Sequence, residues 1–224
     1  MKNLSSILKR KTIKRTFLLS LLLGIYILLS AYSYVNAVSK DLADSVFRLH
    51  VIANSDSKED QDLKYKVRDS LIAYMNTLAK DVSSKEEVIS LAQSHIADFQ
   101  SIAEKTISDN GFDYPVTIKI GNFSFPTKTY GDISFPAGFY DALRVEIGNA
   151  SGQNWWCVMF PPLCFVDVSS GIVPEDSKNI MKENLTEEEY NLIANGNTNQ
   201  EDEITFKFKL IEMLENIKIL TAKK

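Results

Sequence analysis

Four polar residues in the first quarter of the chain, Arg48, His50, Asn54 and Asp56, are spaced so that they could act together. Arg48 and His50 alternate along one apolar segment, and Asn54 and Asp56 follow in the turn after it. A histidine beside a carboxylate is a common pair for general acid–base catalysis. The same side chains could instead cap a helix and satisfy one another in a turn, or recognise a partner protein. The residues alone leave these interpretations open.

Sequence signatures of the common hydrolases and phosphate-binding enzymes are absent from the chain. It contains no G-x-S-x-G, H-E-x-x-H or D-[ST]-G motif and no G-x-x-x-x-G-K-[ST] loop. His95 borders the apolar stripe of a helix, where we interpret it as an ordinary half-buried residue and not as a ligand. Two cysteines and two histidines make a poor zinc set. We therefore expect no catalytic residue, no metal and no cofactor.

Hydrophobic periodicity and turn residues give the order of the elements that must position this cluster. Residues 46–53 alternate as a strand, with Arg48 and His50 facing away from its apolar side chains. Helices are expected at about 58–80 and 84–108, and a polar, acidic insert at about 169–203 holds one short helix, 186–194. The remaining expected elements are strands at 116–120, 125–130, 140–147, 154–160 and 204–208 and a helix around 210–220, with 140–147 and 154–160 paired as a hairpin. This order predicts an α+β fold with a mainly antiparallel sheet, on which two amino-terminal helices and one carboxyl-terminal helix pack.

The amino terminus reads as a targeting segment. Six basic residues precede residues 17–35, which carry no charge and approach the length of a membrane span. Val35 and Ala37 place small residues three before and one before a cleavage site for signal peptidase after Ala37. Residues 1–37 are thus either a cleaved signal peptide or a membrane anchor, and both export a single domain, 38–224. We expect membrane contact only through residues 17–35.

Charge separates the targeting segment from the exported domain. Residues 1–37 hold six basic and no acidic side chains, so the remainder carries 19 basic against 29 acidic side chains, a net charge of −10. This balance argues against binding to nucleic acid and against adsorption to anionic lipid, which both need a basic surface. A basic partner stays possible on these grounds.

The two cysteines, Cys157 and Cys164, lie in the most apolar part of the exported domain. An even number of cysteines in an exported chain suggests a disulfide, although two buried thiols would also fit the sequence. Beside them stand Trp155 and Trp156, in a segment, 154–160, that is apolar on both faces. Either that strand is central in the sheet, or one of its faces is an interaction surface with tryptophan anchors.

Several long, ordered strings resemble one known family. They are Phe47 to Asp56, Lys64 to Asp69, Tyr140 to Val145 and Trp155 to Phe165. Together they are similar to stage II sporulation protein R of endospore-forming Firmicutes, over roughly Val46 to Asp167. The acidic insert and the last helix contribute less to this resemblance.

The resemblance implies a signalling protein that is made in the forespore and exported into the space between the forespore and mother-cell membranes. There it would activate a membrane-embedded aspartic protease of the mother cell, which processes the sporulation sigma factor E precursor. The family supplies no catalytic residues, so the chain would be a ligand and not an enzyme. The alternative is an exported cell-envelope hydrolase that uses His50 with a carboxylate such as Asp56. The residues we infer to contact the partner are Arg48, His50, Asn54, Asp56, Trp155 and Trp156.

Overall fold

The computed structural model describes residues 2–80, 82, 84–161, 164, 173 and 175–194. The chain divides into two compact units, Met1–Val38 and Ser39–Lys224. The predicted strand 204–208 and the predicted helix around 210–220 lie outside the described residues, as do parts of the insert at 169–203.

The first unit belongs to one long helix, α1 (Lys2–Ser45), whose last residues enter the second unit. Its segment Ile13–Ser30 is long and apolar enough to cross a membrane, with a mean hydropathy of 1.7 and no buried share. A helix of this kind at the amino terminus fits a signal sequence or a membrane anchor. Ala37 lies inside α1 and is exposed. Cleavage after it stays a prediction.

The second unit is built on a four-stranded sheet with the strand order β2-β5-β1-β6. The strands are β1 (Phe47–Ile52), β2 (Val116–Phe125), β5 (Gly138–Ile147) and β6 (Asn154–Phe160). β1 runs parallel to β5 and antiparallel to β6, whereas β2 and β5 are antiparallel. The short strands β3 (Lys128–Tyr130) and β4 (Ile133–Phe135) form a separate hairpin. The predicted α+β class with a mainly antiparallel sheet is confirmed.

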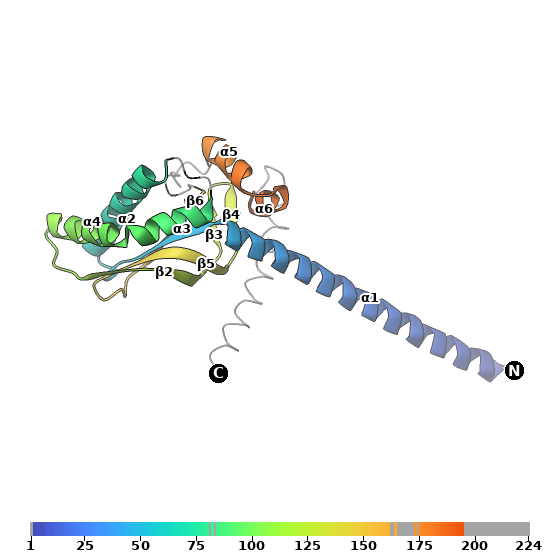
Figure 1. The fold of residues 1–224 in the computed structure, drawn as a ribbon. Helices are drawn as coiled ribbons and strands as arrows, with labels where there is room; N and C mark the ends of the chain where they lie inside the picture. The colour runs from blue at the N-terminus through green and yellow to red at the C-terminus, as the bar shows by residue number, and fades with distance from the viewer. Residues whose placement is uncertain are drawn as a thin grey trace. The chain divides into compact units, whose positions relative to one another are not determined.

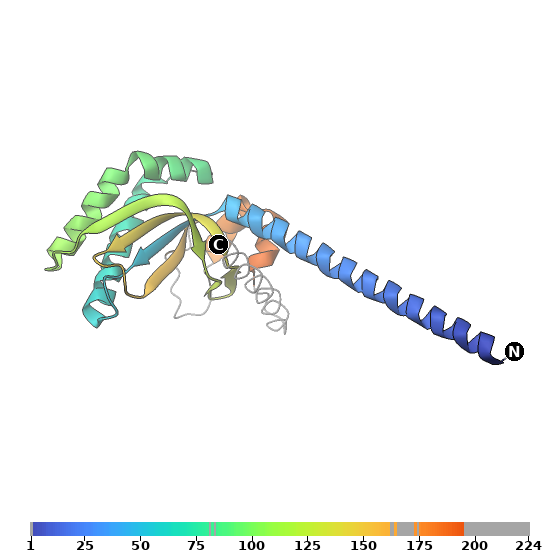
Figure 2. The same cartoon turned by 90° about the horizontal axis from the view of Figure 1, so that it is seen from below.

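Three helices cover one face of this sheet: α2 (Lys58–Leu78), α3 (Lys85–Ser94) and α4 (Ile96–Asp109), as Figure 1 shows. α2 begins where predicted, because the Ser57 side chain accepts a hydrogen bond from the Asp60 backbone N–H and the first turn is acidic. Apolar side chains of the helices and of one side of the strands form the core. In Figure 2 the strands lie in front, with the helices behind and beside them. Among the described residues, no helix covers this opposite face of the sheet.

All six residues of β1 are buried, although the sequence predicted a strand with polar side chains on one side. β1 has a strand on each side, helices over one face, and aromatic side chains from other strands over the other. Arg48 is fully buried and His50 is only 6% exposed. The alternation of β1 was therefore correct, but the sequence did not indicate that both of its faces are buried.

The prediction that residues 140–147 and 154–160 pair as a hairpin is wrong. β1 inserts between β5 and β6 and pairs with both, so these two strands are not neighbours. Hydrophobic patterning identifies each strand but carries no information about which strands pair.

Three other element boundaries differ from the predictions. The helix expected at 84–108 is two helices, which meet at His95, the residue that ends α3 and precedes α4. The strands expected at 116–120 and 125–130 are instead a ten-residue β2, which continues through Gly121 and Asn122, and the short β3. β4 was not predicted.

Two short helices lie in the region that the sequence assigned to a polar insert. α6 (Glu187–Ile193) matches the predicted helix and begins with a capping box, in which Thr186 and Glu189 bond each other's backbone N–H. α5 (Glu175–Asn184) was not predicted. Both helices anchor apolar side chains, since Met181 and Ile193 are fully buried. The mobility of this insert stays a prediction.

Candidate functional site

One face of the sheet carries a row of four side chains, one from each strand. The register aligns Lys119 of β2 with Arg144 of β5, Arg144 with His50 of β1, and His50 with Trp156 of β6. Aligned residues on neighbouring strands point to the same face, about 5 Å apart. We call these four residues the open-face row.

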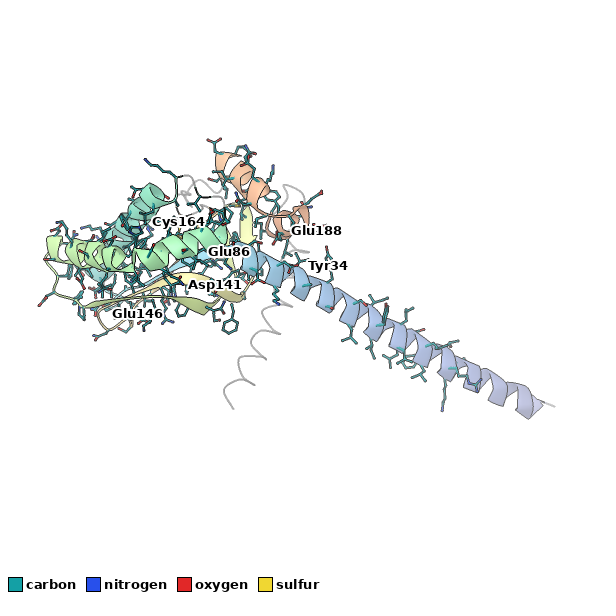
Figure 3. The ribbon with its side chains drawn as sticks, in the orientation of Figure 1. Tyr34, Glu86, Asp141, Glu146, Cys164 and Glu188 are labelled. Atoms are coloured by element: carbon teal, nitrogen blue, oxygen red, sulfur yellow. A yellow bond between two sulfur atoms is a disulfide. The ribbon has the colours of Figure 1, made fainter. Side chains whose placement is uncertain are left out.

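The open-face row lies on the face opposite the three helices. Asp141 forms an ion pair with Lys85 of α3 at 2.8 Å, so its side of β5 faces the helices. It is an odd number of residues away from both Arg144 and Glu146, which lie three and five positions later in the same strand. Successive side chains of a strand alternate between faces, and Arg144 and Glu146 therefore point the other way. In Figure 3, Glu146 lies on the side of the sheet opposite to Glu86 of α3.

At the β6 end of the row, His50 and Trp156 stack on each other. Their ring centroids are 5.5 Å apart and their planes differ by 16°. His50 Nε2 lies 2.7 Å from Asn154 Oδ1, which assigns the proton to Nε2 when the ring is neutral. The Lys128 Nζ lies 4.1 Å from the Trp156 ring centroid, a cation–π distance. The indole is thus held between an imidazole and an ammonium group.

At the β2 end, one carboxylate serves two cations. Glu146 Oε1 lies 2.9 Å from Arg144 Nε, and its Oε2 lies 3.1 Å from Lys119 Nζ. Arg144 Nε lies close enough to Glu146 for an ion pair, but among the described residues it makes no hydrogen bond, so this contact is ionic only. The guanidinium Cζ also lies 5.3 Å from the Phe123 ring centroid. These groups are partly exposed, so each pair contributes little to stability.

Burial and neighbouring groups set the protonation state of His50. Burial lowers its pKa, the hydrogen bond to Asn154 raises it, and the positive charge of Arg144 lowers it, with a net shift below the usual value of 6.5. The ring is therefore neutral at pH 7. Nδ1, its other nitrogen, is buried and has no hydrogen-bond partner among the described residues.

Arg48 lies two residues before His50 in β1, so its side chain points to the same face of the sheet, where aromatic rings surround it. Its Cζ is 4.2 Å from the Phe125 ring centroid, 4.7 Å from that of Tyr140 and 5.5 Å from that of Phe135. Its Nη2 donates to the Tyr130 hydroxyl at 3.0 Å, whereas Nε and Nη1 have no hydrogen-bond partner in the described part of the chain. The rings replace part of the hydration that the guanidinium loses on burial.

Asn54 and Asp56 have a different role, because they join two loops. Asn54 Nδ2 donates to Asp60 Oδ2 at 2.8 Å, and its Oδ1 accepts the Asn149 backbone N–H at 2.9 Å. Asp56 Oδ1 accepts the Gln153 backbone N–H at 2.7 Å. We call this set of bonds between the β1–α2 loop and the β5–β6 loop the latch. Both residues thus have partners within the protein, although Asp56 is still exposed. Their contact with a partner protein stays a prediction.

Two glycines let the loops of the latch approach each other. Gly148 has a φ of +57°, and a Cβ there would collide with Oδ1 of Asn54. A Cβ on Gly152 would collide with the backbone carbonyl of Ser55. The carboxyl of Asp60 completes the latch: burial raises its pKa, but hydrogen bonds from Ser55 and Asn54 outweigh burial and lower it. The latch therefore holds an ionised carboxylate in place.

The two tryptophans lie on opposite faces of β6. Trp155 packs against α2, with its ring centroid 5.5 Å from that of Tyr65 in an edge-on arrangement and 4.3 Å from Arg68 Cζ. Trp156 belongs to the open-face row. Both are half-buried, and β6 is an edge strand and not a central one.

Cys157 and Cys164 form a disulfide, which links β6 to the segment that follows it. Disulfides persist in oxidising compartments, so the bond points to export, in agreement with the apolar amino-terminal helix.

The structure thus separates the six residues singled out in the sequence into three groups. His50, Trp156 and Arg48 share the open face, Asn54 and Asp56 form the latch, and Trp155 packs against a helix. Sequence reasoning missed Lys119, Arg144 and Lys128 as companions of His50. Arg144 does alternate with apolar neighbours, but only the strand register reveals that it lies beside His50.

Among the described residues, no group of three or more histidine, cysteine, aspartate or glutamate side chains could hold a metal ion.

Comparison with known proteins gave two matches. The sequence model of the family described as stage II sporulation protein R matches residues 43–170, which include every strand of the sheet and helices α2 to α4. A protein of Bacillus subtilis (strain 168), named stage II sporulation protein R, is 35% identical over 185 residues, which are 79% of this chain and 83% of that protein. No solved structure matched.

Proposed function

The chain belongs to the stage II sporulation protein R family, and from this premise we propose that it is an exported, non-enzymatic signal for sporulation. In this proposal the forespore exports the protein into the space between the two membranes. There it activates a membrane-embedded aspartic protease of the mother cell, which processes the sporulation sigma factor E precursor. Signal peptidase releases the domain, or α1 keeps it tethered.

The surroundings of His50 carry this proposal. A hydrolase that used His50 with Asp56 would need the carboxylate against the imidazole, but Asp56 bonds the backbone of Gln153 and His50 bonds the amide of Asn154. An amide cannot stabilise an imidazolium as a carboxylate does. The neutral, buried ring of His50 is therefore a packing and recognition group.

The second histidine does pair with a carboxylate, but in a structural setting. His95 Nδ1 lies 2.8 Å from Asp98 Oδ2, at the exposed junction of α3 and α4, and the Tyr74 hydroxyl donates to the same oxygen at 2.8 Å. Three side chains that satisfy one another at a helix junction stabilise the turn between the helices. We assign no catalysis to them.

An activator acts by binding one state of its target better than another. A target that is 1% active needs about 5.5 kcal/mol of differential binding to become 99% active. The open-face row offers the types of residue that concentrate binding energy, since tryptophan and arginine are enriched at the centres of interfaces. We assign contact with the protease to this face.

Reconstitution tests the proposal. Precursor, protease and this protein are expressed together in a host that does not sporulate, and each is omitted in turn. We expect cleavage of the precursor only when all three are present. Equal cleavage without this protein refutes the activator role, and cleavage without the protease identifies this protein as the hydrolase.

A further inference from the structure

We infer that the open-face row binds an acidic segment of a partner protein through its carboxylates. The inference deepens the proposed function, on which it rests for the identity of the partner as the protease. Its physical basis is independent of that identity.

Charge complementarity is the first argument. The exported domain has a net charge of −10, yet its open face carries Lys119 and Arg144 beside Glu146, and Lys128 over Trp156 at the other end of the row. A local excess of positive charge attracts an acidic segment to this face, whereas the negative charge of the rest of the domain disfavours its binding elsewhere. Glu146 fixes the two cations at the β2 end without neutralising both of them.

Unused hydrogen-bonding groups are the second argument. Trp156 Nε1 is buried and has no hydrogen-bond partner among the described residues, and the same holds for His50 Nδ1. A buried donor without an acceptor is costly, and the indole N–H can only donate. Because both atoms are buried, a carboxylate reaches them only where a covering side chain, such as Lys128 over the indole, moves aside. There it would accept from the indole N–H, and its charge would favour the protonated form of His50, in which Nδ1 also donates.

The shape of the row suits an extended segment. Three spacings between strands make the row about 14 Å long, the length of about four residues of extended chain. Trp156 stands at one end and Lys119 at the other, while Phe123 flanks the Arg144 guanidinium. Aromatic walls beside cations exclude water from the ion pairs and so strengthen them.

Acidic peptide is favoured over anionic lipid as the occupant. Arg144 keeps only 31% of its side-chain surface exposed, and a flexible acidic side chain reaches such a partly covered group more easily than the headgroups of a flat membrane do. The net charge of −10 would also repel an anionic bilayer from the rest of the domain.

Binding of a labelled peptide tests the inference directly. Full-length protein in neutral detergent is titrated into a fluorescein-labelled decaglutamate peptide, and fluorescence anisotropy is measured at 50 and 300 mM NaCl. We expect saturable binding that weakens about tenfold at the higher salt. Decaglutamine should not bind. Equal binding of both peptides, or no binding of decaglutamate, overturns the inference.

A pair of matched charge reversals locates the site. Lys119 and Lys105 are both exposed and both pair with a carboxylate, Glu146 and Asp109 respectively, but Lys105 lies on α4. Lys119→Glu should weaken decaglutamate binding about tenfold, whereas Lys105→Glu should change it less than twofold. Equal effects of the two variants overturn the inference. Thermal unfolding of both variants checks that each is folded.

Two further measurements separate the remaining outcomes. Trp156→Phe keeps the aromatic ring but removes Nε1, and it should weaken binding about threefold or more. Vesicles of pure phosphatidylglycerol that bind the wild type more strongly than Lys119→Glu, when decaglutamate does not bind, would assign the row to lipid and not to α1, and so overturn the proposal.

Failure of this inference differs from failure of the proposed function. If Lys119→Glu activates precursor cleavage as well as the wild type does, the function stands and the row is not its contact surface. If the wild type does not activate cleavage but binds decaglutamate through the row, the inference stands for another partner.

Discussion

Replacing Asn54 by alanine tests whether this residue belongs to the latch or to a surface for a partner. The side chain donates to the Asp60 carboxylate at 2.8 Å and accepts the Asn149 backbone N–H at 2.9 Å. A hydrogen bond to a charged group contributes about 1.5–3 kcal/mol, and one between neutral groups about 1 kcal/mol. Because Asn149 is exposed, water replaces part of its lost bond. We therefore expect Asn54→Ala to lower the free energy of unfolding by about 2–3 kcal/mol.

Urea unfolding followed by circular dichroism measures this change. With a dependence on urea of about 2 kcal/mol per molar, the midpoint should fall by about 1–1.5 M at pH 7. Asn149→Ala is the control, because that residue enters the latch only through its backbone. It should change the free energy of unfolding by less than about 0.5 kcal/mol.

The pH dependence of the same difference identifies the lost bond. The pKa of Asp60 is below its usual value in the folded protein, so its ionised form stabilises the fold above about pH 4 and this contribution disappears as the pH falls through the folded pKa. Without the Asn54 amide, the folded pKa moves back toward the unfolded value. The wild type and Asn54→Ala should therefore converge in stability on acidification.

A different result would restore the original interpretation of Asn54. If Asn54→Ala costs less than about 1 kcal/mol of stability but lowers precursor cleavage tenfold in the reconstituted system, Asn54 contacts the partner and the latch is not its role.

Three further changes test other parts of the structure. His50→Gln should make the stability of the protein less dependent on pH. Below about pH 6.5 the unfolded chain binds a proton on His50, whereas the folded chain binds it only below its lower pKa, so the stability of the wild type rises with pH between these two pKa values. Urea unfolding at pH 5 and 7 should show a smaller rise in the variant. An unchanged slope would mean that His50 is not buried as a neutral ring. Cys157→Ser, which opens the small loop closed with Cys164, should lower the free energy of unfolding by about 2.5 kcal/mol, and a reductant should then have no further effect on the melting temperature. Gly152→Ala should lower the free energy of unfolding by more than about 2 kcal/mol, as urea unfolding would measure, because the new Cβ collides with a backbone carbonyl of the β1–α2 loop. A decrease below about 0.5 kcal/mol would mean that the two loops are not in contact.

Local patterns in the sequence were enough for most of the elements. The capping serine and acidic first turn marked the start of α2, and the alternation of β1 and β5 marked these strands. The break at His95 was missed because the apolar stripes of α3 and α4 continue one another across it. Signals of this kind depend only on residues nearby in the sequence, so they predict helices and strands without knowledge of the fold.

The candidate site could be predicted only in part, because it depends on pairing between distant strands. His50 and Trp156 were both singled out, but nothing in their own surroundings shows that they stack. Arg144 and Lys119 come beside them only because β1 inserts between β5 and β6. Asn54 and Asp56 are close to His50 in sequence, which wrongly suggested a common cluster, since the chain leaves the sheet before it reaches them.

The position of β1 also has a consequence for how the protein crosses a membrane. β1 is the first strand to emerge when the chain is exported from its amino terminus, yet Leu49 pairs with Leu143 and Cys157, roughly a hundred residues later. The sheet therefore cannot close around its central strand until β6 has crossed. A topology dominated by such distant pairs folds slowly, which keeps the chain extended while it is threaded through a translocation channel. In the proposed role, the domain would thus complete its sheet only after export.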